Sequence, residues 1–171
     1  MSHAAHPAVY CCLVPYAWIR FFHIASAIGF AGIHGASIVV LYVIRNERDR
    51  GRIESILGFS AKTVTAMYLT LVTVVGTGLW LGFEVTIFLR RPWYWLSLAL
   101  LVVTSLLMWF VAKPFAERIR AACDIRPSGV PRVSDEELAM ILRSRRVHVI
   151  AAIGVIGLGA VLYLMVFRPN F

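Results

Sequence analysis

Four long apolar stretches, separated by short polar segments, dominate the chain. Their nearly uncharged cores are Phe21–Ile44, Thr63–Leu89, Pro92–Ala112 and Val147–Phe167. A hydrocarbon layer about 30 Å thick needs roughly 20 apolar residues at a helical rise of about 1.5 Å each. Each stretch meets that length. The pattern therefore predicts an all-α protein, a four-helix transmembrane bundle with spans at about 17–45, 62–89, 92–113 and 146–167.

Composition agrees with the span count. Hydrophobic residues make up 60% of the 171 residues, and the mean hydropathy of +0.77 lies outside the usual range of soluble domains. Because four spans and their connections nearly exhaust the chain, we expect a single integral membrane domain over residues 1–171. The sequence holds no nucleotide-binding or phosphate-binding motif, which argues against primary transport.

The positive charge is unevenly distributed, and its placement predicts the topology. Of the 17 Lys and Arg, 13 fall in the two longer loops, between spans one and two and between spans three and four. By the positive-inside rule these loops are cytoplasmic and both termini are outside. The membrane topology therefore explains most of the net charge of +8. Attraction to anionic lipid headgroups is a secondary role of these residues, and we expect no nucleic-acid partner.

The second long loop reads as structured. Ser134 and Glu137 have the spacing of a capping box at a helix start, and the apolar pattern then runs unbroken, which predicts one helix over about 135–167. Span three is expected to continue through Pro114 to about Cys123, bending at the proline. These extensions of spans three and four are predicted to pair as a short cytoplasmic helical hairpin.

Span one carries two contrasting faces. Small residues form a stripe that lets a neighbouring helix approach closely, at Ala25, Gly29, Gly32 and Ala36. His23 and His34 share the opposite face, roughly 16 Å apart along the axis. Two membrane histidines on one side of a helix are an arrangement that haem-binding bundles use. The alternative is that each histidine only hydrogen-bonds a neighbouring helix or faces a partner subunit.

Ligand pairing limits the haem hypothesis. A bis-histidine haem takes one ligand from each of two helices. His34 could pair with His148 of span four, although their expected depths differ, whereas His23 has no histidine partner within one chain. The three histidines are candidate haem or pigment ligands on these grounds.

Glu84 is the unusual acid of the membrane region. Because Glu84 and His23 have similar expected depths, we expect an outer polar cluster of Glu84, His23 and Arg20. Such a cluster could relay protons, bind a quinone headgroup or hold a cation. The alternative is an ion pair that only fixes the packing of spans one and two.

The N-terminal tail contains soft metal ligands at His3, His6, Cys11 and Cys12. Their spacing matches no strong metal template, so we expect no metal site.

Several short motifs resemble a known family. They are the run Trp18–His23 with a Gly/Ala-rich continuation to Gly35, the run Thr77–Leu81, and Lys113 followed by Pro114. In these the chain looks like an uncharacterised family of bacterial predicted integral membrane proteins, and more distantly like the copper-resistance-D bundles, in which His23 would match a recurrent early histidine. The resemblance implies a multi-pass protein of the bacterial cytoplasmic (inner) membrane, with both termini periplasmic.

Two functions remain open from the sequence. We favour a non-catalytic accessory subunit that docks onto other membrane subunits of a larger energy-converting complex, of the photosynthetic reaction-centre or respiratory electron-transport type. The alternative is a small redox protein that binds haem b or quinone through His23, His34, Glu84 and His148. Haem b and quinone are therefore the candidate cofactors, and the lipid bilayer is a partner in both cases.

Overall fold

The protein is a bundle of long helices. The computed structural model describes residues 7–169, with side chains from residue 15 onward. Its elements are α1 (Pro7–Ile44), α2 (Arg50–Glu84), the 3-10 turn η1 (Phe88–Arg90), α3 (Pro92–Cys123), α4 (Asp135–Leu142) and α5 (Arg146–Phe167). Four segments are long and apolar enough to cross a membrane. The predicted all-α, four-span fold is thus confirmed, and the side on which the termini lie stays a prediction.

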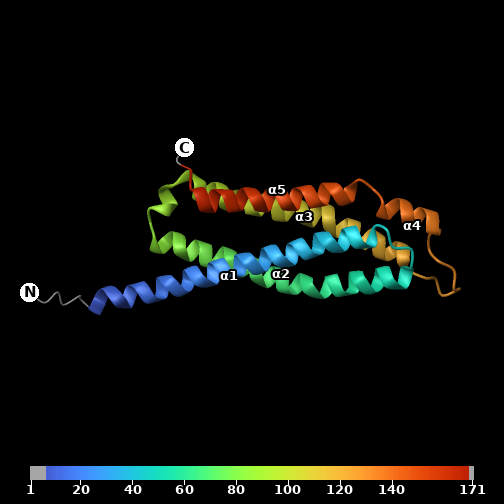
Figure 1. Cartoon of the computed structure of the whole chain (residues 1–171), viewed down its shortest axis with the longest axis horizontal. Coiled ribbons are helices and arrows are strands. Elements are labelled where there is room, and N and C mark those ends of the chain that lie inside the picture. Colours follow the sequence, from blue (N-terminus) through green and yellow to red (C-terminus); the bar gives the residue numbers. More distant parts are fainter. Residues whose placement is uncertain (1–6, 170–171) are drawn as a thin grey trace, which may run out of the picture.

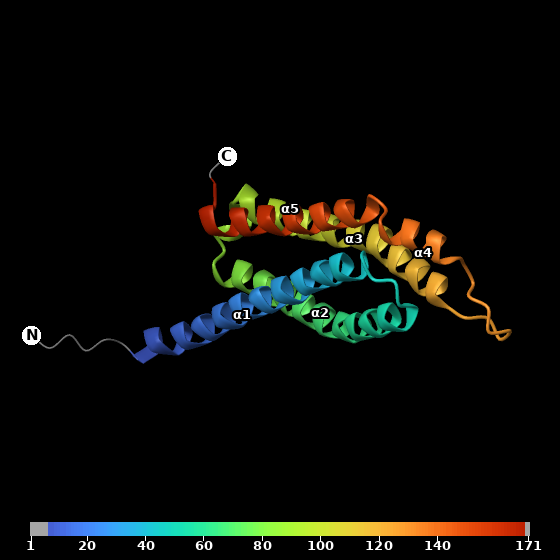
Figure 2. The same cartoon turned by 45° about the vertical axis from the view of Figure 1, so that its right-hand side comes forward.

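The helices form two pairs. Contacts are most extensive between α1 and α2 and between α3 and α5, while smaller contacts of α2 with α3 and of α1 with α5 join the pairs. Both views show the two pairs stacked, with the N-terminal turns of α1 projecting beyond the other helices (Figures 1 and 2). The C-terminal end of α5 lies at this same end of the bundle.

The segment between spans one and two departs from the prediction. We expected a loop up to about residue 62, but α2 already begins at Arg50. The Asp49 side chain starts the helix by accepting bonds from the backbone N–H groups of Gly51 and Arg52. Ile53 and Leu57 are buried against the rest of the bundle, and their packing stabilises the helical turns between Arg50 and residue 62.

The predicted helical hairpin is present at the loop end of the bundle. Helix α3 runs through Pro114 to Cys123. The apolar face of α4 buries Leu138 and Leu142 in one cluster with Phe115 and Ile119 of α3. This cluster, which also takes in Ile44, Ile53 and Leu57, is the main buried core of the described residues.

The predicted continuous helix over 135–167 is interrupted, which corrects that expectation. Helix α4 ends at Leu142 and α5 begins at Arg146. Residues 143–146 are Arg-Ser-Arg-Arg, so this turn offers no apolar side chain to tie it to the bundle, and its like charges repel. Of the predicted capping box, the structure shows the bond from the Glu137 N–H to Ser134 Oγ, at 3.2 Å.

Arg50 ties the loop end together, a role that the sequence did not reveal. Its guanidinium donates to Asp135 Oδ1 at 2.7 Å, to the Ala122 carbonyl at 2.7 Å and to the Val133 carbonyl at 2.8 Å. Its side chain is only 13% exposed. One cation thus joins the start of α2, the end of α3 and the start of α4.

Candidate functional site

His23 packs against α2. Its Nδ1 lies 3.1 Å from the Val74 carbonyl oxygen and 3.0 Å from Thr77 Oγ1. The Thr77 hydroxyl already donates to the Thr73 carbonyl at 2.5 Å, so His23 Nδ1–H is the donor in both contacts. Gly78 makes room for the ring, because a Cβ there would lie 3.1 Å from His23 Cε1. Because the Val74 carbonyl can only accept, this bond places a proton on Nδ1.

The structure does not form the predicted cluster of His23, Glu84 and Arg20. The Glu84 carboxylate instead accepts a hydrogen bond from Trp80 Nε1 at 3.3 Å, within its own helix. His23 meets α2 at Thr77, which is seven residues or about 10 Å of helix away from Glu84. Helix α1 begins at Pro7, so Arg20 lies well inside this helix.

Glu84 borders a shallow hollow on the outside of α2. Its lining residues all come from this one helix: Gly76, Leu79, Trp80, Phe83 and Glu84. Trp80 and Phe83 are 57% and 67% exposed. A surface formed by a single helix surrounds no ligand, so the hollow offers a contact for lipid or a partner rather than an enclosed site.

His34 is the most buried histidine of the described residues, at 7% exposed. Its ring stacks on Phe30 of the same helix, with the centroids 5.8 Å apart. It enters a notch at Gly154 of α5, where any Cβ would collide with His34 Nε2. This close approach leaves no space for a haem plane between His34 and α5.

His148 is held at the loop end by Tyr42 of α1 and by Arg45, which directly follows α1. Arg45 Nη1 lies 2.8 Å from His148 Nε2, and Tyr42 Oη lies 2.9 Å from Nδ1. Since a guanidinium can only donate, Nε2 is the acceptor, which places the ring proton on Nδ1. Any metal at Nε2 would have to displace Arg45.

The structure does not bring the predicted haem pair together. His34 meets α5 at Gly154, whereas His148 meets α1 at Tyr42, eight residues or about 12 Å of helix beyond His34. A haem ligated by both imidazoles needs the two rings on opposite sides of one iron. One chain in this arrangement therefore lacks the ligand pair.

A common packing device joins the four long helices. In each case a polar or aromatic side chain of α1 or α3 enters a glycine notch on α2 or α5, where a Cβ would collide with it or, at Gly78, crowd it closely. The four contacts are His23 with Gly78, Tyr94 with Gly82, His34 with Gly154 and Thr104 with Gly157. Helix α2 thus receives side chains from α1 and α3, and so does α5. Small residues that admit a neighbour are the usual basis of helix packing in membranes.

The sequence reasoning missed Tyr94 and Thr104. Tyr94 is 6% exposed, and its hydroxyl donates to the Gly78 carbonyl at 3.3 Å. A signal was available, because Gly78 with Gly82 and Gly154 with Gly157 recur at helical spacings of four and three residues.

The predicted stripe of small residues on α1 mostly faces away from the rest of the chain. Ala25, Gly32 and Ala36 are exposed, and nothing lies within 4 Å of a Cβ placed at Gly32. Gly29 alone approaches a neighbour, with Thr70 Cγ2 3.4 Å from its would-be Cβ. Because the histidine face is the one that packs inward, the opposite stripe is left uncovered.

The N-terminal ligand candidates fall outside this description. His3 and His6 lie outside the described residues, and Cys11 and Cys12 lie on α1 in a part whose side chains are not described. Within the described part, no three His, Cys, Asp or Glu side chains gather in a way that could hold a metal ion.

Comparison with known proteins places the chain in a family. Neither a curated protein nor a solved structure matches it. A family model described as predicted integral membrane protein (DUF2269) matches residues 17–169, which cover all four spans. The more distant resemblance to copper-resistance-D bundles stays a prediction. The chain belongs to the DUF2269 family of predicted integral membrane proteins.

Proposed function

We propose that the protein is a non-catalytic accessory subunit, which docks onto another membrane protein through the uncovered face of α1. The observation that carries the proposal is the small-residue stripe Ala25, Gly32 and Ala36, exposed on the outside of the bundle. Small residues gain little from contact with lipid, but they let a second helix approach closely enough for extensive packing.

Two further features support docking at α1. Its N-terminal turns extend beyond the other helices (Figure 1). Next to this extension, Trp18, Phe21 and Phe22 are more than half exposed and contact one another edge to face or tilted. Exposed aromatic side chains are enriched in protein interfaces, and Trp is also enriched at the headgroup level of membranes.

The polar membrane residues also fit a structural role. His23 and His148 are both committed to hydrogen bonds between helices, and His34 fills the Gly154 notch. We propose an energy-converting complex as the partner, which is the class that we expected from the sequence.

Purification from native membranes in a mild detergent tests the proposal. We expect the tagged protein to migrate in a defined larger complex, and Gly32→Leu to release it while leaving the isolated chain folded. Gly159→Leu on α5 is the matched control, because Gly159 is also exposed with nothing within 4 Å. A wild-type protein that migrates alone, or a complex that survives Gly32→Leu, would contradict the proposal.

One observation favours the alternative function, a redox protein that binds haem b. The bond from His23 Nδ1–H to the Val74 carbonyl is the kind of contact that orients ligating histidines in metal sites. Among the described residues no second histidine lies beside His23, so we expect a haem there to need a ligand from another chain. This candidate predicts a Soret band in the purified complex that disappears in His23→Ala.

A further inference from the structure

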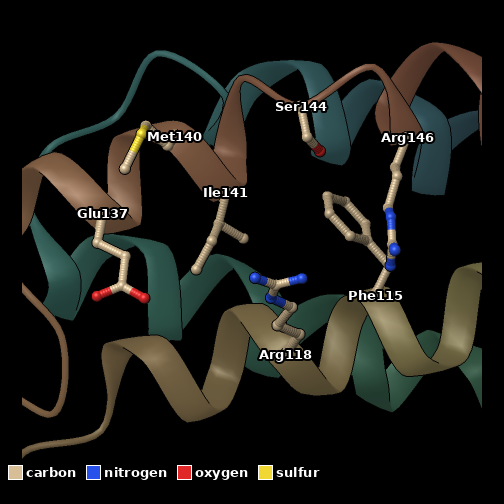
Figure 3. Close-up of a pocket in the computed structure, with 7 residues that line it drawn as sticks. All are labelled: Phe115, Arg118, Glu137, Met140, Ile141, Ser144 and Arg146. Atoms are coloured by element: carbon tan, nitrogen blue, oxygen red, sulfur yellow. The ribbon is translucent and has the colours of Figure 1, made fainter.

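A pocket lies where α3, α4 and the start of α5 meet. Figure 3 shows it between Phe115 and Arg118 on α3 and the α4–α5 segment. Its volume is about 310 Å³, and its remaining lining residues are Glu137, Met140, Ile141, Ser144 and Arg146. None of the roles described above uses this pocket.

Two arginine side chains line the pocket, and their guanidinium groups have no hydrogen-bond or ion-pair partner among the described residues. The side chains of Arg118 and Arg146 both extend into the space between α3 and the α4–α5 segment (Figure 3). Within the part of the chain that the structure describes, neither makes an ion pair or a side-chain hydrogen bond. Arg50, by contrast, donates hydrogen bonds to three protein oxygens at the same end of the bundle. The pocket therefore carries unused donors suited to an anion with several oxygens.

Ser144 adds an unpaired hydroxyl group to the lining of the pocket. Its Oγ is buried and is the one buried side-chain oxygen or nitrogen that has no hydrogen-bond partner among the described residues. Buried hydroxyl groups are nearly always paired in folded proteins. Because Ser144 lines the pocket, its hydroxyl is a candidate donor to an oxygen bound there.

The position of the pocket favours a membrane lipid as the source of such an anion. Arg146 is the first residue of α5, and Phe115 lies just beyond the predicted end of span three, so both stand at the expected headgroup level. Phe115, Met140 and Ile141 provide an apolar wall beside the two cations. Basic pockets between helices at this depth suit lipids whose phosphate is charged and whose chains remain in the hydrocarbon layer.

We propose that this pocket binds the phosphodiester of an anionic glycerophospholipid. Arg118 and Arg146 hold the phosphate oxygens and Ser144 donates to one of them. Glu137 lines the other end of the pocket and opposes a negative charge, which limits the site to a monoanionic phosphodiester. The site is independent of the subunit role proposed above, because it lies on α3, α4 and α5 rather than on α1.

Lipid titration of the purified protein in a neutral detergent tests the site, with bound lipid counted by native mass spectrometry. The probes are phosphatidylglycerol, phosphatidylcholine with the same acyl chains, and inorganic phosphate. We expect one tightly bound phosphatidylglycerol, and a loss of affinity of roughly tenfold or more in Arg118→Gln and Arg146→Gln. Arg126→Gln, in an exposed loop away from the pocket, should bind like the parent.

Glu137→Gln should tighten phosphatidylglycerol binding, because it removes a repulsive charge. A gain of affinity of this kind cannot result from misfolding, so this variant separates loss of the site from loss of the fold. Equal binding of phosphatidylcholine, saturation by inorganic phosphate alone, or unchanged affinity in both arginine variants would each overturn the proposal.

Discussion

Replacing Gly154 by alanine should test whether the glycine notches hold the bundle together. A Cβ at this position collides with Nε2 of His34, which is buried between α1 and α5. Overpacking of this kind costs about 1–3 kcal/mol. The intrinsic gain of alanine over glycine in a helix, about 0.5–1 kcal/mol, acts in the opposite direction. A control that shares this gain is therefore needed.

Gly159→Ala provides the control, because Gly159 lies in the same helix with nothing within 4 Å of its would-be Cβ. The propensity term cancels between the two variants, so Gly154→Ala should be less stable than Gly159→Ala by about 1–3 kcal/mol. Equilibrium unfolding in mixed micelles measures the difference.

A double variant identifies the cause of the loss. If the collision with His34 is responsible, His34→Ala should relieve it, and the two substitutions should couple by about 1–2 kcal/mol. Equal stability of the two glycine variants, or strict additivity of Gly154→Ala and His34→Ala, would refute this packing scheme.

Three further predictions concern the loop end and the topology. Arg50→Ala should lower the free energy of unfolding by about 2 kcal/mol, because three acceptors lose a charged donor, whereas Arg126→Ala should leave it within about 0.5 kcal/mol. Cys123 is 3% exposed, so in a variant without the two N-terminal cysteines it should react with a maleimide only after denaturation; rapid labelling of the folded protein would contradict its burial. Single cysteines at Arg126 and Arg91 should be labelled from opposite sides of the membrane, the former from the cytoplasm, and labelling from one side would reject the topology.

The four spans could be predicted from the sequence because membrane insertion depends on summed hydrophobicity, which requires no knowledge of neighbours. The same holds for the two faces of α1, since helical periodicity alone placed His23 and His34 opposite the small-residue stripe. Which face packs inward was not predictable from this pattern. That choice depends on partners such as Gly78 and Gly154, which lie more than 50 residues away in the sequence.

Contacts between helices were harder to predict, because they require the axial offset of one helix against another. A charged residue is a poor marker of a helix end, because Arg20 lies well inside α1. The predicted partner of His23 is Glu84, whereas the structure places Thr77 beside it. The early start of α2 was missed for a related reason. The polar segment before residue 62 reads as a loop unless Asp49 is recognised as a cap and Ile53 as the first buried residue.

Photo-crosslinking in intact native membranes tests the central claim, that the uncovered face of α1 docks a partner membrane subunit. A photoreactive residue at Ile28 lies on this face, one turn before Gly32, and Ile156 on α5 is an equally exposed control, at 70% against 69%. We predict one discrete adduct with a membrane protein from position 28, none from position 156, and loss of the adduct in the Gly32→Leu variant. No adduct from position 28, or the same adducts from both positions, would contradict it.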